Sequence, residues 1–346
     1  MDLLVDDVGS YPLPPAMDRL SFNEAYVLAR EAVVSKKFAS QNGSLLDSFR
    51  RVVIDSLKQK CATGLDVVSY PQHYSMYEQF SNPINEAMSE GTYVVEEKKA
   101  IMPELHVIDE EAKQLSEEVG MGRILLRVCI TGPMELYLKE VGTTPYVDIL
   151  LMFAETVRRF AENAVLNSKY VKTEVISIDE PSFGFQDIST NRDMISDVLE
   201  KAFDFGNVTK QIHLHSSTRA ADLLEVNNLD VLSFEFAASP KNIEWVSKKM
   251  LDDADKQIRV GVARTDINSI LAELTDKGIM KPDAEQIAES EETIKKRFIT
   301  AKSKFGDRMT FTGPDCGLGG WPSQEAAQLL LARTVRAVKA AGFKIA

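Results

Sequence analysis

The sequence predicts an α/β protein built as a (β/α)8 TIM barrel, with an N-terminal helical extension and an insertion after the second strand. Short apolar, β-rich runs alternate with longer amphipathic stretches along the chain, which is typical of parallel strands joined by crossover helices. Eight such runs over 346 residues favour an eight-unit barrel over a doubly wound sheet. No linker or low-complexity stretch divides the chain, so we expect one domain over residues 1–346.

The eight predicted strands are apolar runs that end at polar residues or glycine. They cover residues 3–9, 65–69, 124–131, 175–178, 211–215, 231–236, 257–262 and 309–312. Amphipathic patterns predict helices after most of them, at residues 146–167, 194–205, 218–225, 241–251, 284–305 and 323–341. Ser323, with Glu325 soon after it, indicates the N-terminus of the last helix.

Two segments exceed what a minimal barrel needs. The stretch from residue 9 to residue 65 has room for at least two helices, which form the N-terminal extension. The stretch from residue 88 to residue 122 predicts a β-like segment at 92–95 and an acidic helix at 109–118. We therefore expect both additions to lie outside the ring of eight strands.

Composition restricts the class of protein. A hydrophobic fraction of 44% is enough to bury a large core. The net charge of −12 argues against nucleic acid or an anionic membrane surface as the main partner. Three scattered cysteines do not make a disulfide framework, and the N-terminus lacks a basic region followed by an apolar core. No run approaches the length of a membrane span. We expect a cytoplasmic protein.

Two histidines indicate a metal site. His213 and His215 are two residues apart in a strand-like run, so their side chains face the same way and can reach one ion. Glu235 and Cys316 are also metal-ligand types, and they follow two other predicted strands. The loops after barrel strands carry the chemistry of this fold. Ser10, Asp179, Glu180 and Asp315 occur at comparable positions. Taken alone, the histidine pair would indicate half-buried polar residues, and Asp179 would indicate a capping or salt-bridged acid.

Four motifs occur in order along the chain. They are Val8-Gly9-Ser10-Tyr11-Pro12, Thr131-Gly132-Pro133, Ile178-Asp179-Glu180-Pro181, and the set formed by His213-Leu214-His215, Glu235 and Pro314-Asp315-Cys316-Gly317-Leu318. This ordered set resembles the C-terminal catalytic barrel of the cobalamin-independent methionine synthase family, in its short core type. The resemblance runs over most of the chain.

The resemblance implies a zinc-dependent thiol methyltransferase that converts homocysteine to methionine. It implies Zn2+ ligands at His213, Glu235 and Cys316, with His215 where the family has a cysteine. Two imidazoles, one thiolate and one carboxylate would make the zinc site neutral, which favours stronger Lewis acidity. The resemblance further implies that the amino acid end of the substrate is bound at Gly9, Ser10, Asp179 and Glu180.

Two departures from the family pattern bear on the substrates. The family has a second acid after the second strand, where this chain has Val68-Ser69-Tyr70-Pro71-Gln72-His73, so another small thiol such as coenzyme M stays open as the acceptor. The family also has Asp-Ile-His-Ser after the seventh strand, where this chain has Asp266-Ile267-Asn268-Ser269. Asparagine cannot protonate a departing folate nitrogen.

The missing acid, and the absence of the family's N-terminal barrel from this sequence, favour a methylcorrinoid over methyltetrahydrofolate as the methyl donor. A corrinoid protein is then a possible partner, docking on a rim formed by residues 70–77 and 317–321. Two other readings remain. In a zinc hydrolase, a metal-bound water would react with Asp179 or Glu180 as base, although four protein ligands leave little room for water. A non-catalytic, zinc-stabilised binding module is the third.

Overall fold

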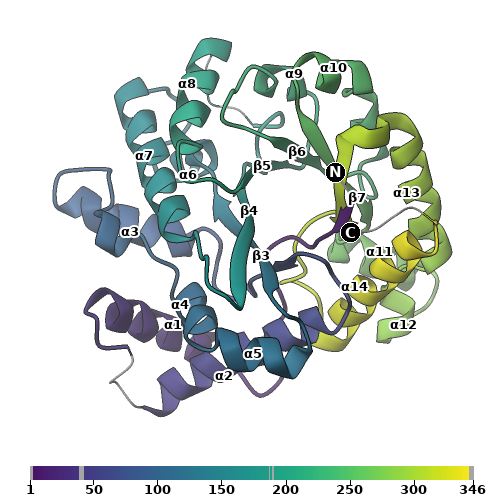
Figure 1. Cartoon of the computed structure of the whole chain (residues 1–346), viewed down its shortest axis with the longest axis horizontal. Coiled ribbons are helices and arrows are strands. Elements are labelled where there is room, and N and C mark those ends of the chain that lie inside the picture. Colours follow the sequence, from purple (N-terminus) through teal and green to yellow (C-terminus); the bar gives the residue numbers. More distant parts are fainter. Residues whose placement is uncertain (1–2, 39–42, 187, 189–190, 343–346) are drawn as a thin grey trace.

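Eight parallel strands form the centre of the protein, whose computed structural model describes residues 3–38, 43–186, 188 and 191–342. The strands pair in the order β1-β8-β7-β6-β5-β4-β3-β2. A bridge between Asp6 and Val67 joins the two ends of this series, so the sheet closes into a ring (Figure 1). The predicted (β/α)8 barrel is confirmed. Its strands are β1 (Leu4–Val5), β2 (Val68–Ser69), β3 (Ile124–Thr131), β4 (Val171–Asp179), β5 (Thr209–Leu214), β6 (Val231–Phe234), β7 (Gln257–Ala263) and β8 (Met309–Pro314).

The helices surround this ring (Figure 1). They are α1 (Arg19–Val34), α2 (Ser44–Cys61), α3 (Glu78–Ser89), α4 (Pro103–Glu110), α5 (Ala112–Val119), α6 (Pro133–Glu140), α7 (Val147–Asn163), α8 (Arg192–Ala202), α9 (Ala220–Leu223), α10 (Lys248–Asp253), α11 (Ile267–Asp276), α12 (Ala284–Ile287), α13 (Glu291–Phe305) and α14 (Gln324–Lys339). Short 3-10 turns lie at η1 (Glu97–Lys99), η2 (Pro240–Glu244) and η3 (Gly306–Arg308). Within the described ranges, no helix combines the length and apolar character that a bilayer crossing needs.

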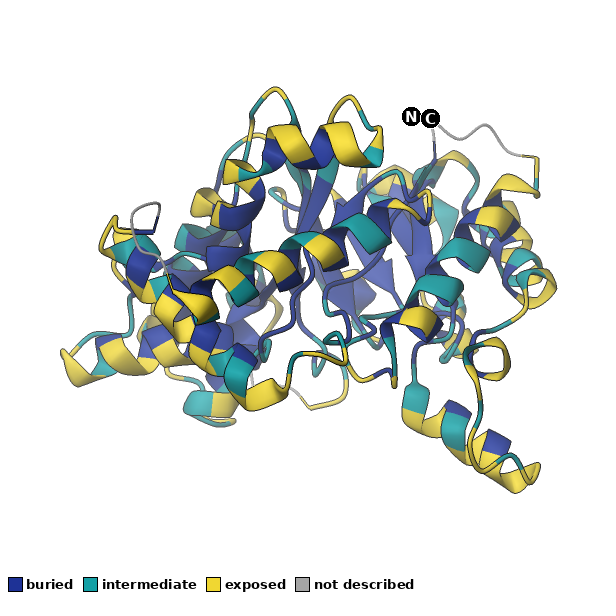
Figure 2. Cartoon of the chain, turned by 90° about the horizontal axis from the view of Figure 1, so that it is seen from below, coloured by how far each residue is buried: buried dark blue, intermediate teal, exposed yellow. Residues whose placement is uncertain are grey.

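Burial follows the amphipathic pattern of the sequence. The strands are almost wholly buried, while the helices expose their outer faces (Figure 2). In α7, for example, Phe153, Val157 and Phe160 occur at helical spacing and are fully buried. Burying a side chain of this size stabilises the fold by roughly 1.5–3 kcal/mol. The inward face of each helix therefore holds it against the barrel.

The two additions to the barrel lie where they were predicted, with differences in detail. Helices α1 and α2 connect β1 to β2, and α3, α4 and α5 lie between β2 and β3. The strand prediction at 92–95 is wrong, because the backbone there pairs with a helix side chain: Val95 N donates to Thr156 Oγ1, and that hydroxyl donates to Tyr93 O. The predicted acidic helix at 109–118 is divided between α4 and α5 at Glu111.

Helix ends agree with the capping residues. Ser323 accepts a hydrogen bond from Ala326 N at 3.1 Å, which confirms the predicted start of α14. The helix predicted at 284–305 is instead two helices, because Ala288 has an extended backbone. Ser290 then caps α13 through Thr293 N. The helix predicted at 241–251 is likewise divided, between η2 and α10.

A buried ionic layer lies inside the barrel. Asp6 accepts from Arg127 at 2.8 Å and from Arg259 at 2.6 Å, and all three side chains are fully buried. The second guanidinium nitrogen of Arg127 donates to Ser177 Oγ at 2.8 Å, and Ser177 donates to Asp179 Oδ1 at 2.7 Å. This chain of contacts holds Asp179 at the carboxyl end of β4. We call the end of the barrel at which the carboxyl ends of the strands lie the mouth.

Candidate metal centre

Four ligand-type side chains converge at the mouth. His213 lies in β5, His215 follows the end of β5, Glu235 follows β6, and Cys316 follows β8. Each offers one ligand atom, and these four atoms all lie within 4.8 Å of one another. Parallel pairing produces this convergence, because β5, β6, β7 and β8 are consecutive neighbours in the sheet and their carboxyl ends lie at the same edge. The structure thus brings together all four predicted metal-ligand residues.

The distances in this cluster suit a small cation. His215 Nε2 lies 3.6 Å from Cys316 Sγ and 3.4 Å from Glu235 Oε1. A tetrahedral zinc site with ligand distances of about 2.0–2.3 Å separates its donor atoms by about 3.3–3.8 Å. Both measured pairs fall in that range. The four ligand atoms are separated by up to 4.8 Å, which exceeds the tetrahedral spacing, so the more distant atoms would move closer together when a zinc ion binds.

His213 supplies an observation that itself indicates a ligand. Its Nδ1 lies 3.0 Å from Ser233 Oγ, while its Nε2 is buried and has no hydrogen-bond partner among the described residues. Buried polar atoms in proteins are normally paired. Metal-binding histidines commonly hold one ring nitrogen through a hydrogen bond and present the other to the metal. The side chains present therefore fit a zinc ion.

Burial favours the neutral form of every group in the cluster. It lowers the pKa of His213 and His215, and it raises the pKa of Cys316. Burial, assisted by the charges of Asp315 and Asp266, raises the pKa of Glu235 to about 8. The imidazoles are consequently ready as neutral ligands, whereas the thiol and the carboxyl would release protons when a cation binds.

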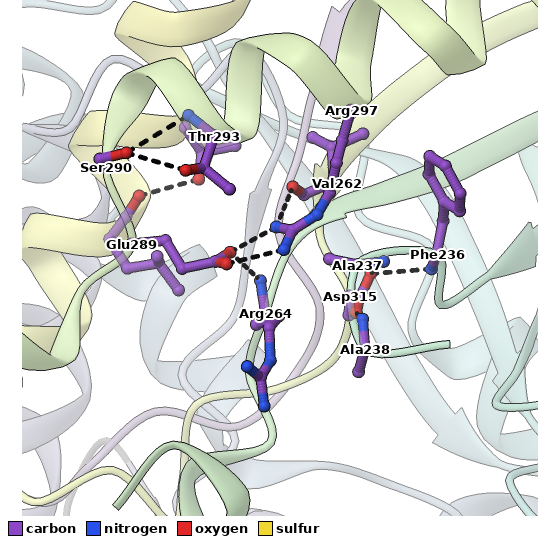
Figure 3. A network of polar contacts seen from close by, with 12 residues as sticks. Phe236, Ala237, Ala238, Val262, Arg264, Glu289, Ser290, Thr293, Arg297 and Asp315 are labelled. Atoms are coloured by element: carbon purple, nitrogen blue, oxygen red, sulfur yellow. Dashed lines mark hydrogen bonds and ion pairs between the residues drawn. The ribbon is translucent and has the colours of Figure 1, made fainter. Parts of the chain in front are cut away.

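Backbone contacts keep the ligand loops together. Asn242 Nδ2 donates to His215 O at 2.7 Å and to Glu235 O at 2.8 Å. Asp315 is fully buried beside Cys316, and its carboxylate accepts from the amides of residues 236, 237 and 238 (Figure 3). A Cβ at Gly261 would lie 2.3 Å from Asp315 Oδ1, so this approach requires glycine. Sequence reasoning missed Asn242, which lies in a 3-10 turn and carries no motif signal.

The loop after β7 is fixed by a second network. Arg297 binds both oxygens of Glu289, at 2.6 and 2.8 Å, and Arg264 N donates to Glu289 Oε2 at 2.7 Å (Figure 3). Arg264 in turn pairs with Asp266 at 2.7 Å. The segment that leads to Asn268, which is exposed in the first turn of α11, is thus anchored at its start.

The Gly9-Ser10 segment lies next to the Cys316 loop. Gly9 has a φ of +46°, a conformation that favours glycine, and its N–H donates to Ser69 Oγ at 2.8 Å. Ser10 Oγ accepts from Gly319 N at 3.0 Å, and a Cβ at Gly317 would lie 2.4 Å from that oxygen. The first and last strand ends are therefore in direct contact.

Asp179 and Glu180 have different surroundings. Asp179 pairs in register with His213, and burial raises its pKa to about 6. Glu180 is buried, and its two oxygens accept from Met134 N at 2.9 Å and Glu135 N at 2.7 Å, at the start of α6. A Cβ at Gly132 would lie 2.2 Å from the Glu180 carboxyl carbon, which explains the glycine of the Thr-Gly-Pro motif. Glu180 stabilises a helix start, and Asp179 has fewer partners.

Several other residues of the mouth escaped sequence reasoning, or lie elsewhere than expected. Glu135, in the first turn of α6, and Gln72, whose Oε1 would lie 3.1 Å from a Cβ at Gly9, both belong to the mouth. Neither belongs to a motif, although Glu135 comes soon after Thr131-Gly132-Pro133. The docking rim expected at residues 70–77 is wrong in part, because residues 70–74 are buried. Of these, the His73 and Tyr74 rings pack against Phe22 and Tyr26 of α1, at centroid distances of 5.4 and 3.9 Å.

No protein-family model matches the chain, and no curated protein matches it. Solved structures do. A B12-independent methionine synthase from Shewanella sp. W3-18-1, in complex with selenomethionine, is 16% identical over 98% of this chain and 98% of that chain, with a TM-score of 0.60. The homocysteine methyltransferase MmuM from Escherichia coli is 10% identical over 96% of each chain, with a TM-score of 0.44.

An endo-β-1,4-mannanase from Thermotoga petrophila is 11% identical over 84% of this chain and 74% of that chain, again with a TM-score of 0.44. The last two likenesses are too distant to carry weight. The first extends over both chains nearly in full, and at 16% identity it establishes the fold alone. This chain has the barrel fold of that methionine synthase.

Proposed function

We propose that the protein is a zinc-dependent methyltransferase that acts on a small thiol, with homocysteine as the first candidate. The observation that carries the proposal is the cluster of His213, His215, Glu235 and Cys316 at the barrel mouth, with a buried His213 Nε2 that has no partner among the described residues. The ordered motifs of the sequence and the fold shared with a methionine synthase support it.

The four side chains would hold the ion as two neutral imidazoles, one thiolate and one carboxylate. When bound, zinc would act as a Lewis acid that lowers the pKa of a thiol placed at the site. The two negative ligands, Glu235 and Cys316, balance the ion's charge, so the buried site as a whole would be neutral. Asp315 and Asn242 keep the ligand loops in place while the acceptor binds.

The polar end of the acceptor would lie against Gly9, Ser10 and Asp179. Asp179 is held by Ser177 and has no lysine or arginine partner within hydrogen-bond distance among the described residues. A carboxylate in that situation can bind the ammonium group of an amino acid. Glu180 would assist indirectly, because its carboxylate lies against Gly132 and binds the first amides of α6.

A methylcorrinoid is the donor that best fits the groups at the mouth. Methyltetrahydrofolate requires a proton on its departing nitrogen. Asn268 cannot supply it. His73 is buried between Tyr11 O and Ser56 Oγ, and burial lowers its pKa to about 3, so it does not act as an acid near neutral pH. With a methylcorrinoid the cobalt–carbon bond breaks with its electron pair left on cobalt, and no proton is needed.

The competing hydrolase has less support in the structure. It needs a carboxylate base beside the metal, and Glu180 has both oxygens occupied by backbone amides. Of the two candidate bases, Asp179 and Glu180, Asp179 is the one whose oxygens accept no backbone amide among the described contacts. Four protein ligands leave little room for the metal-bound water that a hydrolase needs, so we keep thiol methylation as the proposal.

The decisive experiment crosses donors with acceptors in one assay. The purified, zinc-loaded protein is incubated with methylcobalamin, a methylated corrinoid protein or methyltetrahydrofolate, each with homocysteine or coenzyme M, and methylated thiol is measured by mass spectrometry. We expect methionine from a corrinoid donor and little or none from the folate. Rapid turnover with methyltetrahydrofolate would overturn the donor assignment, and no product with any pair would overturn the function.

A further inference from the structure

Glu135 is a second carboxylate at the mouth that has no cationic partner among the described residues. It lies in the first turn of α6, directly after β3, and its side chain is 6% exposed. Its Oε1 accepts from Tyr77 Oη at 2.7 Å, and its Oε2 accepts from Ser182 N at 3.0 Å. Both partners are neutral, so the charge of Glu135 is not compensated by an ion pair.

Glu135 and Asp179 lie on the same side of the mouth. Gly132 N, just before α6, donates to Asp179 O at 2.8 Å, so the ends of β3 and β4 are joined there. Glu180 follows Asp179 in the chain and accepts from Glu135 N at 2.7 Å. Asp179 and Glu135 thus lie beside Glu180, after neighbouring strands. The positive charges of Arg127 and Arg259 act on Asp179 without a direct contact, whereas no ion pair involves Glu135 among the described residues.

Most other charged groups that the structure describes around the mouth are matched, and Lys139, one turn after Glu135 on α6, lies over the Tyr77 ring at 4.4 Å from its centroid. Arg264 pairs with Asp266 and Glu273, and Arg219 pairs with Asp222. Asp315 and Glu180 receive backbone amides. A buried carboxylate without a cation is costly, because burial removes its solvation. An incoming ammonium group would remove that cost, whereas an incoming sulfonate would add a third negative charge.

We propose that Glu135 is a specificity-determining residue that acts with Asp179 to bind the amino group of the acceptor. The inference rests on the proposed function and narrows the acceptor to an amino-thiol. The hydroxyl of Tyr77, in the loop after β2, orients the Glu135 carboxylate. The ammonium group donates up to three hydrogens, and each oxygen of Glu135 keeps a lone pair beside the hydrogen bond that it already accepts.

A purely structural role for Glu135 is the rival explanation. Its carboxylate joins Tyr77, which precedes α3, to Ser182, which follows β4, so it could serve only to tie two loops together. Two matched variants separate the roles. Glu135→Gln removes the charge and nearly keeps the shape, while Tyr77→Phe removes the loop contact and keeps the charge.

The test compares ligands that differ only in the amino group. Homocysteine and 4-mercaptobutyrate are compared as acceptors by KM. Methionine and 4-(methylthio)butyrate are compared by calorimetric binding, which does not depend on a methyl donor. For the wild-type protein we expect a clear preference for both amines. Glu135→Gln should reduce that preference about 10-fold or more, because it weakens binding of homocysteine and methionine and leaves binding of the deamino analogues nearly unchanged. Tyr77→Phe should keep most of the preference, and Glu135→Asp should restore part of it.

Equal losses for the amino and deamino ligands in Glu135→Gln would overturn the inference, as would a loss in Tyr77→Phe as large as in Glu135→Gln. Failure of the proposed function is a separate outcome. If no methyl transfer occurs but methionine still binds in preference to its deamino analogue, and Glu135→Gln removes that preference, the amino-group site stands without the reaction. If methyl transfer occurs with equal KM values for both thiols, the reaction stands without the amino-group site.

Discussion

Replacing Ser233 with alanine tests how His213 is prepared for a metal. For Nε2 to offer its lone pair, Nδ1 must carry the hydrogen, and Ser233 Oγ at 3.0 Å is then its acceptor. Ser233 is fully buried, so water cannot replace the lost hydroxyl. Leaving a buried N–H unpaired costs about 1–3 kcal/mol. Loss of a contact of this kind typically weakens metal binding by about 10- to 100-fold, and we expect Ser233→Ala to fall in that range.

Zinc affinity can be measured by competition with a chromophoric chelator at fixed pH. Thr310→Val is a matched control, because it removes another buried hydroxyl contact, to Gln257 Oε1 at 2.7 Å, at the start of β8 and away from the mouth. We expect Thr310→Val to bind zinc like the wild-type protein. If Ser233→Ala binds zinc with wild-type affinity, the reasoning is refuted, because His213 would then not bind the metal in the orientation that Ser233 holds.

Three further predictions concern the ligands, the substrate and the buried acids. Cys316→Ser should lose most bound zinc, as measured by elemental analysis, while Cys61→Ser, at a buried cysteine in α2, should retain it; full retention in Cys316→Ser would remove Cys316 from the site. Asp179→Asn should raise the KM for homocysteine far more than for a thiol without an amine, and equal increases would give Asp179 a structural role. Burial raises the pKa of Glu104 to about 8, so the folded protein holds a proton that the unfolded chain releases above about pH 4.5. Wild-type stability should therefore fall by up to several kcal/mol between pH 4.5 and 8 relative to Glu104→Gln, and parallel urea-unfolding curves across that range would contradict this.

The sequence by itself determined the barrel and the positions of its strands. Apolar strands and amphipathic helices can bury their apolar faces against one another in only a few arrangements. Eight alternating strand-helix units form a closed barrel. The capping residue at Ser323 was also readable, because N-cap preference is a local property. The segment at 92–95 was misread as a strand because its partners lie on α7, where the Tyr93 ring packs against Phe153 and Val95 N donates to Thr156, and only the tertiary structure supplies those partners.

The convergence of His213, His215, Glu235 and Cys316 was predictable for a related reason. Parallel strands bring their carboxyl ends to one face, so polar residues at those ends meet there regardless of their distance in sequence. Asn242 and Glu135 could not be found this way, because a 3-10 turn and a helix start have no fixed register with the strands. Their places depend on how the loops pack over the mouth, and packing of that kind depends on contacts between distant residues that no local pattern encodes.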